Sequence, residues 1–177
     1  MSGVHINTIS ITTPKGMDTD SEGNLYVCNF SEIYKLDSSG NTIISWFASG
    51  YVYPYYLVVD SSSNFVYATM GDQSIQKFDL SGNYITAWGS AGSGDGQFAS
   101  DIYGIYLDSL GYVYVTDWGN NRVQKFDSEG GYICSFGEAG VGDGQFDSPW
   151  GIAINSLGNV YISDYANNRI QIFAPVH

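Results

Sequence analysis

The residues best suited to binding chemistry are aromatic side chains that recur at matching places along the chain. They are Phe30, Tyr55, Tyr103, Trp118, Trp150 and Tyr165, with the acids Asp117 and Asp164 beside two of them. Flat rings next to carboxylates suit stacking on a sugar or gripping the side chains of a protein partner. The same rings would also serve as filler between closely packed elements, so both interpretations are open at this stage.

Catalytic chemistry has few candidates in this sequence. The only histidines are His5 and His177, and both lie close to an end of the chain. A histidine-based zinc site and a Ser-His-Asp triad within the body of the chain are therefore excluded. Asp18 is the one acid expected to point inward. We expect no enzyme activity, no bound metal and no cofactor.

Two loop motifs invite a functional interpretation but are better explained by structure. Arg122 and Arg169 each follow an Asn-Asn pair, and repetition predicts that each bonds to nearby carbonyls and to the Asp of its own loop. The sequence Gly-Asp-Gly-Gln-Phe occurs at 94–98 and 142–146. Each copy offers a single carboxylate, which is too few for Ca²⁺, so we expect a glycine-rich turn with a buried Phe.

The charge of the chain limits its partners. The 177 residues include 6 basic and 18 acidic side chains, for a net charge of -12. Such a surface repels nucleic acid and anionic membranes, whereas the charge by itself leaves cationic partners, metal ions and neutral ligands such as sugars open. No apolar run reaches the ~20 residues needed to span a bilayer, and the first residues do not resemble a signal peptide. Secreted, cell-surface and cytoplasmic locations all stay open.

The elements that must position the aromatic residues come from a repeat. Matching tyrosines stand at positions 26, 67, 114 and 161, at spacings of 41, 47 and 47 residues. Each period holds four short apolar runs with strand-like alternation, separated by turn residues such as Ser39-Gly40-Asn41 and Ser81-Gly82-Asn83. The repeat therefore predicts an all-β fold, a β-propeller whose blades are four-stranded antiparallel sheets.

The third and fourth units also resemble a known family. The fourth unit reads Pro149-Trp150-Gly151-Ile152, then Gly-Asn-Val-Tyr-Ile-Ser-Asp at 158–164, then Asn-Asn-Arg-Ile-Gln-Ile-Phe at 167–173. With the Gly-Asp-Gly-Gln-Phe connection before it, this pattern is similar to the NHL repeat. The resemblance implies a propeller used for ligand or partner binding and, more rarely, for catalysis. Propellers of this family commonly have six blades, whereas this chain encodes four.

The domain organisation follows from the repeat. We expect one domain over 1–177, with units at about 12–52, 53–98, 99–146 and 147–177. The last unit stops after its third strand, and an orphan strand at 4–11 precedes the first. We expect residues 4–11 to complete the last blade and close four blades into one ring, which removes an exposed strand edge. The alternative is two chains joined head to tail into a larger ring, so monomer and homodimer both remain open.

The predicted propeller brings the aromatic residues to one face. In each blade the first strand begins, and the second strand ends, on the same face near the axis. The expected binding surface therefore comprises Phe30, Tyr55, Tyr103, Trp118, Trp150 and Tyr165, with Asp117 and Asp164 adjacent. We predict a non-catalytic binding module that contacts a protein partner through this face. The alternatives are a lectin-like propeller for a neutral glycan and a structural module of a surface protein.

Overall fold

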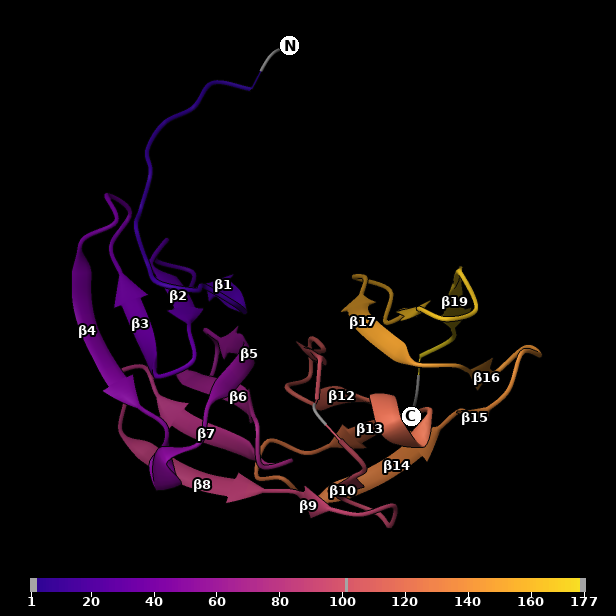
Figure 1. Ribbon diagram of the computed structural model, residues 1–177. Coiled ribbons are helices and arrows are strands. Elements are labelled where there is room, and N and C mark those ends of the chain that lie inside the picture. Colours follow the sequence, from indigo (N-terminus) through magenta and orange to yellow (C-terminus); the bar gives the residue numbers. More distant parts are fainter. Residues whose placement is uncertain (1–2, 101, 176–177) are drawn as a thin grey trace.

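The computed structural model describes residues 3–100 and 102–175, and it is an all-β fold with the blades of a four-bladed β-propeller (Figure 1). Blade 1 contains β1 (Met17–Thr19), β2 (Leu25–Cys28), β3 (Glu32–Leu36) and β4 (Thr42–Phe47). Blade 2 contains β5 (Pro54–Asp60), β6 (Phe65–Met70), β7 (Ile75–Asp79) and β8 (Tyr84–Trp88). Blade 3 contains β11 (Gly104–Leu107), β12 (Val113–Asp117), β13 (Arg122–Phe126) and β14 (Tyr132–Phe136). Blade 4 contains β17 (Pro149–Ile154), β18 (Val160–Asp164) and β19 (Arg169–Phe173).

The strands of each blade pair antiparallel in sequence order, as the repeat predicted. Two short parallel pairs lie between blades: β9 (Ser90–Ala91) with β10 (Gln97–Phe98), and β15 (Glu138–Ala139) with β16 (Gln145–Phe146). The helices of the described residues are two short 3₁₀ turns, η1 (Ser49–Tyr51) and η2 (Trp118–Asn120). Neither of these helices of the described residues is long and apolar enough to cross a membrane.

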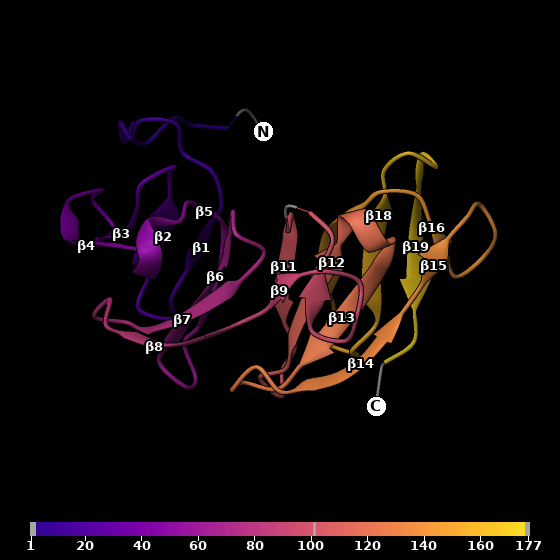
Figure 2. The same ribbon diagram turned by 60° about the horizontal axis from the view of Figure 1, so that its bottom comes forward.

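Ring closure is the point at which the structure differs from the prediction. The blades follow one another around an arc that stays open between blade 1 and blade 4, and a second view places these two blades at opposite ends (Figures 1 and 2). Blade 4 has three strands, and none of the described residues of 4–11 pairs with it. The prediction that residues 4–11 complete blade 4 of the same chain is therefore wrong, because blade 4 lies at the far end of the arc.

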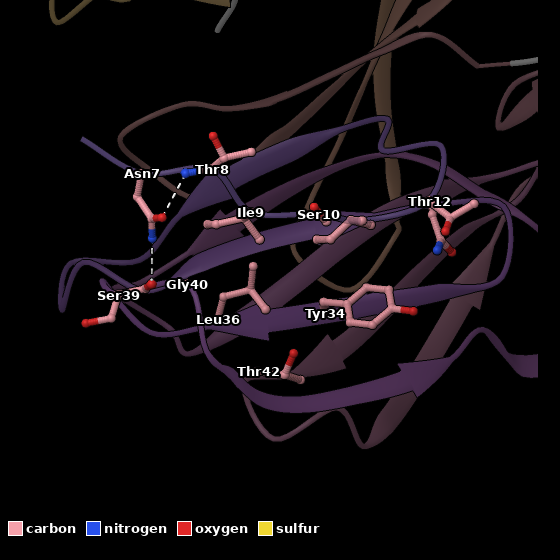
Figure 3. A pocket seen from close by; sticks show the side chains of 12 residues that line it. Asn7, Thr8, Ile9, Ser10, Thr12, Tyr34, Leu36, Ser39, Gly40 and Thr42 are labelled. Atoms are coloured by element: carbon pink, nitrogen blue, oxygen red, sulfur yellow. Dashed lines mark hydrogen bonds between the residues drawn. The ribbon is translucent and has the colours of Figure 1, made fainter. Parts of the chain in front are cut away.

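Residues 7–12 pack instead on the outward face of blade 1 (Figure 3). Asn7 Nδ2 donates to the carbonyl oxygen of Ser39 at 2.9 Å, and Ile9 lies over Leu36 and against Gly40. A cavity of about 370 Å³ remains between this segment and the blade. On the side of blade 1 that has no preceding blade, the segment covers β3 and the turn that follows it, and leaves Met17 of β1 exposed.

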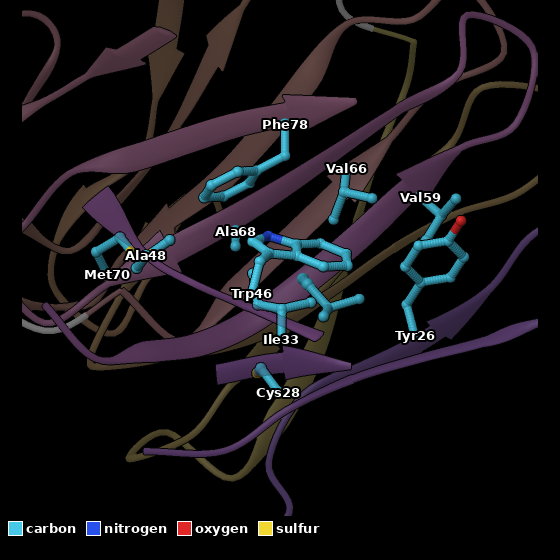
Figure 4. Packing of buried hydrophobic residues seen from close by; sticks show 11 residues of the cluster. Tyr26, Cys28, Ile33, Trp46, Ala48, Val59, Val66, Ala68, Met70 and Phe78 are labelled. Carbon is cyan, nitrogen blue, oxygen red and sulfur yellow. The ribbon is translucent and has the colours of Figure 1, made fainter. Parts of the chain in front are cut away.

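The core of the molecule consists of apolar layers between successive blades. The layer between blades 1 and 2 holds Trp46 and Tyr26 on one side and Val59, Val66 and Phe78 on the other (Figure 4). Similar layers join blade 2 to blade 3 and blade 3 to blade 4. Alternating strand residues face opposite sides of a sheet, so each inner blade contributes one face to each of two layers.

Two tryptophans fasten neighbouring blades in the same way. The Trp46 ring of blade 1 lies against Gly82 of blade 2, and the Trp88 ring of blade 2 lies against Gly130 of blade 3. Each glycine sits in the turn between the third and fourth strands at a φ above +80°, where a side chain would collide with the indole. Glycine is required there both by the turn and by the ring of the preceding blade.

A second repeated contact ties each connecting segment to the blade that follows it. Gln76 Oε1 accepts from the Ser49 N–H at 2.8 Å, and its Nε2 donates to the Ser49 carbonyl at 2.8 Å. Gln124 accepts from the Gly96 N–H at 2.9 Å, and Gln171 accepts from the Gly144 N–H at 2.9 Å. The polar backbone of each linker is thereby satisfied at the edge of the core.

The structure confirms the interpretation of the Gly-Asp-Gly-Gln-Phe segments as turns. Phe98 and Phe146 are fully buried, whereas Asp95 and Asp143 are exposed. Cys28 is buried and Cys134 is half-buried, and both are free thiols. Burial is the main reason that the pKa of the Cys28 thiol rises to about 11.

Candidate functional site

The aromatic residues of blades 3 and 4 gather at one end of the inner strands. Tyr103 stands just before β11 and Trp150 lies at the start of β17, so both occupy the entry to an innermost strand. Trp118 and Tyr165 directly follow β12 and β18, which run in the opposite direction. Because starts of first strands and ends of second strands meet at one edge, the fold brings all four rings together.

The geometry of these rings is that of a stacked pair with flanking rings. Tyr103 and Trp150 are stacked, with centroids 4.0 Å apart and planes 5° apart. Trp118 meets Tyr103 edge-on at 6.1 Å, and Tyr165 is tilted against Trp150 at 5.7 Å. Trp150 and Tyr165 are exposed, while Tyr103 and Trp118 are half-buried. We call these four residues the aromatic platform.

The predicted residues of blades 1 and 2 form a separate group. Phe30 and Tyr55 meet edge-on at 6.3 Å, and Tyr53 approaches Phe30 from another side at 6.4 Å. Lys15 Nζ lies 4.0 Å from the Phe30 centroid and 4.4 Å from the Tyr55 centroid. A cation of the chain itself therefore occupies the ring faces here, and Trp150 of the platform stands at the repeat position that Lys15 has in blade 1.

The two predicted acids do not lie on the surface of the platform. Asp117 and Asp164 are buried. Asp117 Oδ2 accepts from Arg122 Nε at 2.9 Å, and Asp164 Oδ2 accepts from Arg169 Nε at 2.7 Å. Each arginine also donates to backbone carbonyls of the preceding linker, for example that of Gln97 or Gln145. The structural role predicted for both arginines is confirmed, and the acids position the loops that carry Trp118 and Tyr165.

The groups around Asp164 stabilise its negative charge. Burial by itself would raise the pKa of this carboxyl. Hydrogen bonds from the Asp147 N–H and from the side chains of Asn167, Arg169 and Gln171 outweigh burial and hold the pKa below its ordinary value. Asp164 is thus a stable anion at neutral pH, paired within its own blade.

Two further aromatic residues contact the predicted rings but were not predicted from the sequence, although their position in the sequence indicates them. Tyr53 lies two residues before Tyr55 and packs on Phe30, and Tyr56 meets Tyr103 edge-on at 6.5 Å. The run Tyr53-Pro54-Tyr55-Tyr56 is the densest group of tyrosines in the chain. The prediction rested on two repeat positions, the start of the first strand and the residue after the second strand, and Tyr53 and Tyr56 stand at neither.

The inward acid of the inner strands has a structural contact. Asp18 Oδ2 accepts from the Val59 N–H at 2.9 Å, so this inward acid joins blade 1 to blade 2. Within residues 3–100 and 102–175, no three His, Cys, Asp or Glu side chains are grouped so that they could hold a metal ion. His177 lies outside the described residues.

Comparison with known proteins identifies the repeat. A model of the NHL repeat matches residues 104–126 and 146–173, which cover most of blades 3 and 4. No curated protein matches the sequence.

Solved structures similar to this chain include a streptogramin B lyase, with a TM-score of 0.71 and 17% identity over 92% of this chain and 54% of the other. A catalytically inactive H270A virginiamycin B lyase from Staphylococcus aureus with quinupristin gives 0.70 and 15%, over 91% and 55%. An auxiliary nutrient binding protein from Bacteroides thetaiotaomicron gives 0.69 and 17%, over 89% and 46%. The chain spans about half the length of these proteins, and identities this low establish a shared fold alone.

Proposed function

Because this chain is a member of the NHL repeat family with the β-propeller arrangement, we propose that it is a non-catalytic binding module. The aromatic platform contacts a protein partner. The observation that carries this proposal is the stacked Tyr103–Trp150 pair, which joins blade 3 to blade 4, with Trp150 and Tyr165 of blade 4 exposed. Exposed aromatic side chains with fixed neighbours are typical anchors of protein interfaces, since they bury much area and lose little conformational entropy.

The contrast with blades 1 and 2 supports a basic partner. There, Lys15 fills the space over Phe30 and Tyr55, whereas in the platform no lysine or arginine of the chain stands at that repeat position. A lysine or arginine of a partner would find a comparable aromatic surface at Trp150 and Tyr165. The net charge of -12 favours the approach of such a partner.

A neutral glycan is the second candidate, and one feature of the platform favours it. The near-parallel Tyr103 and Trp150 rings hold the indole plane rigidly, which suits stacking on the apolar face of a sugar. Both candidates use the same rings, so a single series of variants tests them side by side.

The experiment is a binding screen of the whole chain on a peptide array that includes basic and aromatic peptides, and on a glycan array. We expect the wild-type chain to bind peptides, and Trp150→Ala and Tyr165→Ala to weaken that binding at least tenfold, the loss of about 1.4 kcal/mol expected for a contact residue. Tyr84→Ala is the control, because Tyr84 is an exposed aromatic on the outer strand β8.

Each result bears on a different part of the proposal. Binding of glycans and not peptides would replace the protein partner with the glycan. Peptide binding that survives both substitutions would exclude the platform as the contact surface. Near-ultraviolet circular dichroism of each variant shows whether the blades remain packed.

A further inference from the structure

The outward face of blade 4 differs from the corresponding faces of the other blades. Ile170 stands at the repeat position of Ile33, Ile75 and Val123. Those three side chains pack on the next blade and are 0% exposed, whereas Ile170 is 62% exposed. Ile172, on the same face of β19, is 63% exposed. Blade 4 thus has the apolar surface of an inter-blade layer with no described residues covering it.

The N-terminal segment, in turn, imitates the outer strand of a blade that would precede blade 1. Ile9 lies against Gly40, as Trp46 lies against Gly82 and Trp88 against Gly130. The imitation extends to the sequence, because the position three residues before each of these side chains is always isoleucine. The isoleucines are Ile6, Ile43 and Ile85.

Blade 4 lacks the strand that this segment imitates. Its sheet ends at β19, so the outer edge of Arg169–Phe173 has no strand beside it among the described residues. An unpaired edge next to an apolar face is a template for a further strand. Within one chain the segment cannot reach that edge, because blade 1 and blade 4 lie at opposite ends of the arc (Figure 1).

We propose that a second copy of this chain completes blade 4. The outward face of blade 4 docks on blade 1 of the second copy, and residues 4–11 of that copy pair with β19 as its fourth strand. Residues 7–12 keep their place on their own blade 1, so no contact is broken. Two copies related by a half-turn make this contact twice, which closes both arcs into one ring.

The register of the new strand pair follows from the blades that are complete. Ile33 pairs with Trp46, Ile75 with Trp88, and Val123 with Phe136. By the same rule, Ile170 lies opposite Ile9 of the second copy. The layer behind this pair continues the three inter-blade layers already present in each chain.

The first strand of blade 1 supplies the matching surface. Met17 occupies the repeat position of Leu57 and Ile105, which are 5% and 8% exposed against the preceding blade. Met17 itself is 67% exposed. Its thioether side chain is available to cover the inner part of blade 4 of the second copy.

The charges at the new contact are compatible with burial. In blade 2, Lys77 Nζ reaches Glu129 in the blade 3 turn at 2.7 Å. Blade 4 has the uncharged Ile172 at the position of Lys77, and the blade 1 turn has Ser39 at the position of Glu129. At this pair of positions the contact therefore buries no charge.

The first test is the molar mass of the whole chain in solution by light scattering. We expect the mass of two chains, falling to that of one chain on dilution. Ile170→Asp places a charge in the new layer and should weaken association by roughly 100-fold or more. Met17→Asp should weaken it as well, because it alters the opposite surface of the contact.

The matched control is Val141→Asp, which adds the same charge at an exposed apolar side chain in the loop between β15 and β16. This variant should associate like the wild type. Near-ultraviolet circular dichroism checks that each variant keeps its packed blades, and both Ile170 and Met17 are exposed enough in one chain for folding to survive.

The second test is a disulfide that reports the register. A chain with Ile9→Cys and Ile170→Cys should form a two-chain product under mild oxidation, because the first position lies on blade 1 and the second on blade 4, at opposite ends of the arc. Ile9→Cys with Val141→Cys should not. A wild-type chain that stays single at millimolar concentration, association that survives Ile170→Asp, or absence of the disulfide would each overturn the proposal. Insensitivity to Met17→Asp would overturn it too, since two blade 4 faces would then be paired with each other.

Discussion

The outward faces of the two end blades differ in how far they are covered. On blade 1, residues 7–12 cover β3, so Leu36 is buried although no blade precedes it. On blade 4, Ile170 and Ile172 stay exposed on a sheet of three strands. The repeat sequence makes every blade a candidate for two apolar layers. Burial at a given repeat position is decided by the neighbour and not by the blade itself.

The same comparison extends to the loops at the inner ends. Blade 4 carries the buried Asp164 with its arginine, whereas blade 1 has Asn29 at that repeat position. The Asn29 side chain accepts hydrogen bonds from the N–H groups of Ser31 and Glu32 at 2.7 and 2.8 Å. In blade 1 the loop after the second strand is therefore held by an amide side chain with two hydrogen bonds to the backbone. In blade 4 the same loop is held by an ion pair and a larger set of hydrogen bonds.

The largest expected effect comes from removing a ring between two complete blades. Trp46→Ala deletes the indole that lies against Gly82 and should lower the free energy of unfolding by about 3–5 kcal/mol. Urea denaturation measures the change. Ile43→Ala in the same strand is the control, because Ile43 is largely exposed and its loss should cost roughly 0.5 kcal/mol. Equal losses in both variants would show that the inter-blade layer is not the main source of stability.

A smaller loss of stability should distinguish the contact between two blades from the contact between blade 1 and the N-terminal segment. Gly82→Ala and Gly40→Ala both place a side chain at a φ above +80° and 2.6 Å from a neighbouring side chain. At Gly82 the neighbour is the buried Trp46, so strain and overpacking together should cost about 2–4 kcal/mol. At Gly40 it is Ile9 of a segment that can shift, so the cost should fall to about 1–2 kcal/mol, mostly from φ.

Thermal or urea unfolding of these two variants side by side gives the comparison. If Gly40→Ala is as costly as Gly82→Ala, residues 7–12 are held as firmly as a blade. The contrast between the two ends of the array would then lie in blade 4 alone.

The smallest effect concerns the charge of Asp164. Its lowered pKa means that the folded chain holds the carboxylate more strongly than the unfolded chain does, so its contribution is present above the unfolded pKa near 3.8. That contribution disappears as pH falls through the lower pKa of the folded state. Asp164→Asn makes the loop more like that of blade 1 and should cost about 1–2 kcal/mol at pH 7. The loss should shrink below pH 3.8, as followed by urea unfolding at several pH values.

Much of the fold could be predicted from the sequence because its repeat is explicit. The tyrosines at 26, 67, 114 and 161 all fall in second strands, and the turn motifs separate third from fourth strands as expected. The closure of the ring could not be predicted in this way. A period shows that blades follow one another, but it carries no information on the rotation between them, and that rotation keeps blade 4 away from residues 4–11.

The candidate site was predicted in part. Its four-ring platform follows from where first strands begin and second strands end, which the sequence reveals directly. The pairing of Arg122 with Asp117 and of Arg169 with Asp164 was predicted from the repeat. The same two acids were also expected on the binding surface, and the two expectations conflict because an acid held by its own arginine is turned into the blade. The sequence does not show that Lys15 lies over Phe30 and Tyr55, since that contact joins two blades.

The glutamine contacts between linkers and blades have a consequence for how the chain folds during its synthesis. Their bonds to the linkers join residues 27 or 28 positions apart, from Ser49 to Gln76, from Gly96 to Gln124 and from Gly144 to Gln171. Loops this short close at low entropic cost, and each closure needs only chain already synthesised. Blade 2 can therefore dock on blade 1 while blade 3 is still in the ribosome. Folding then proceeds in the direction of translation, one blade at a time.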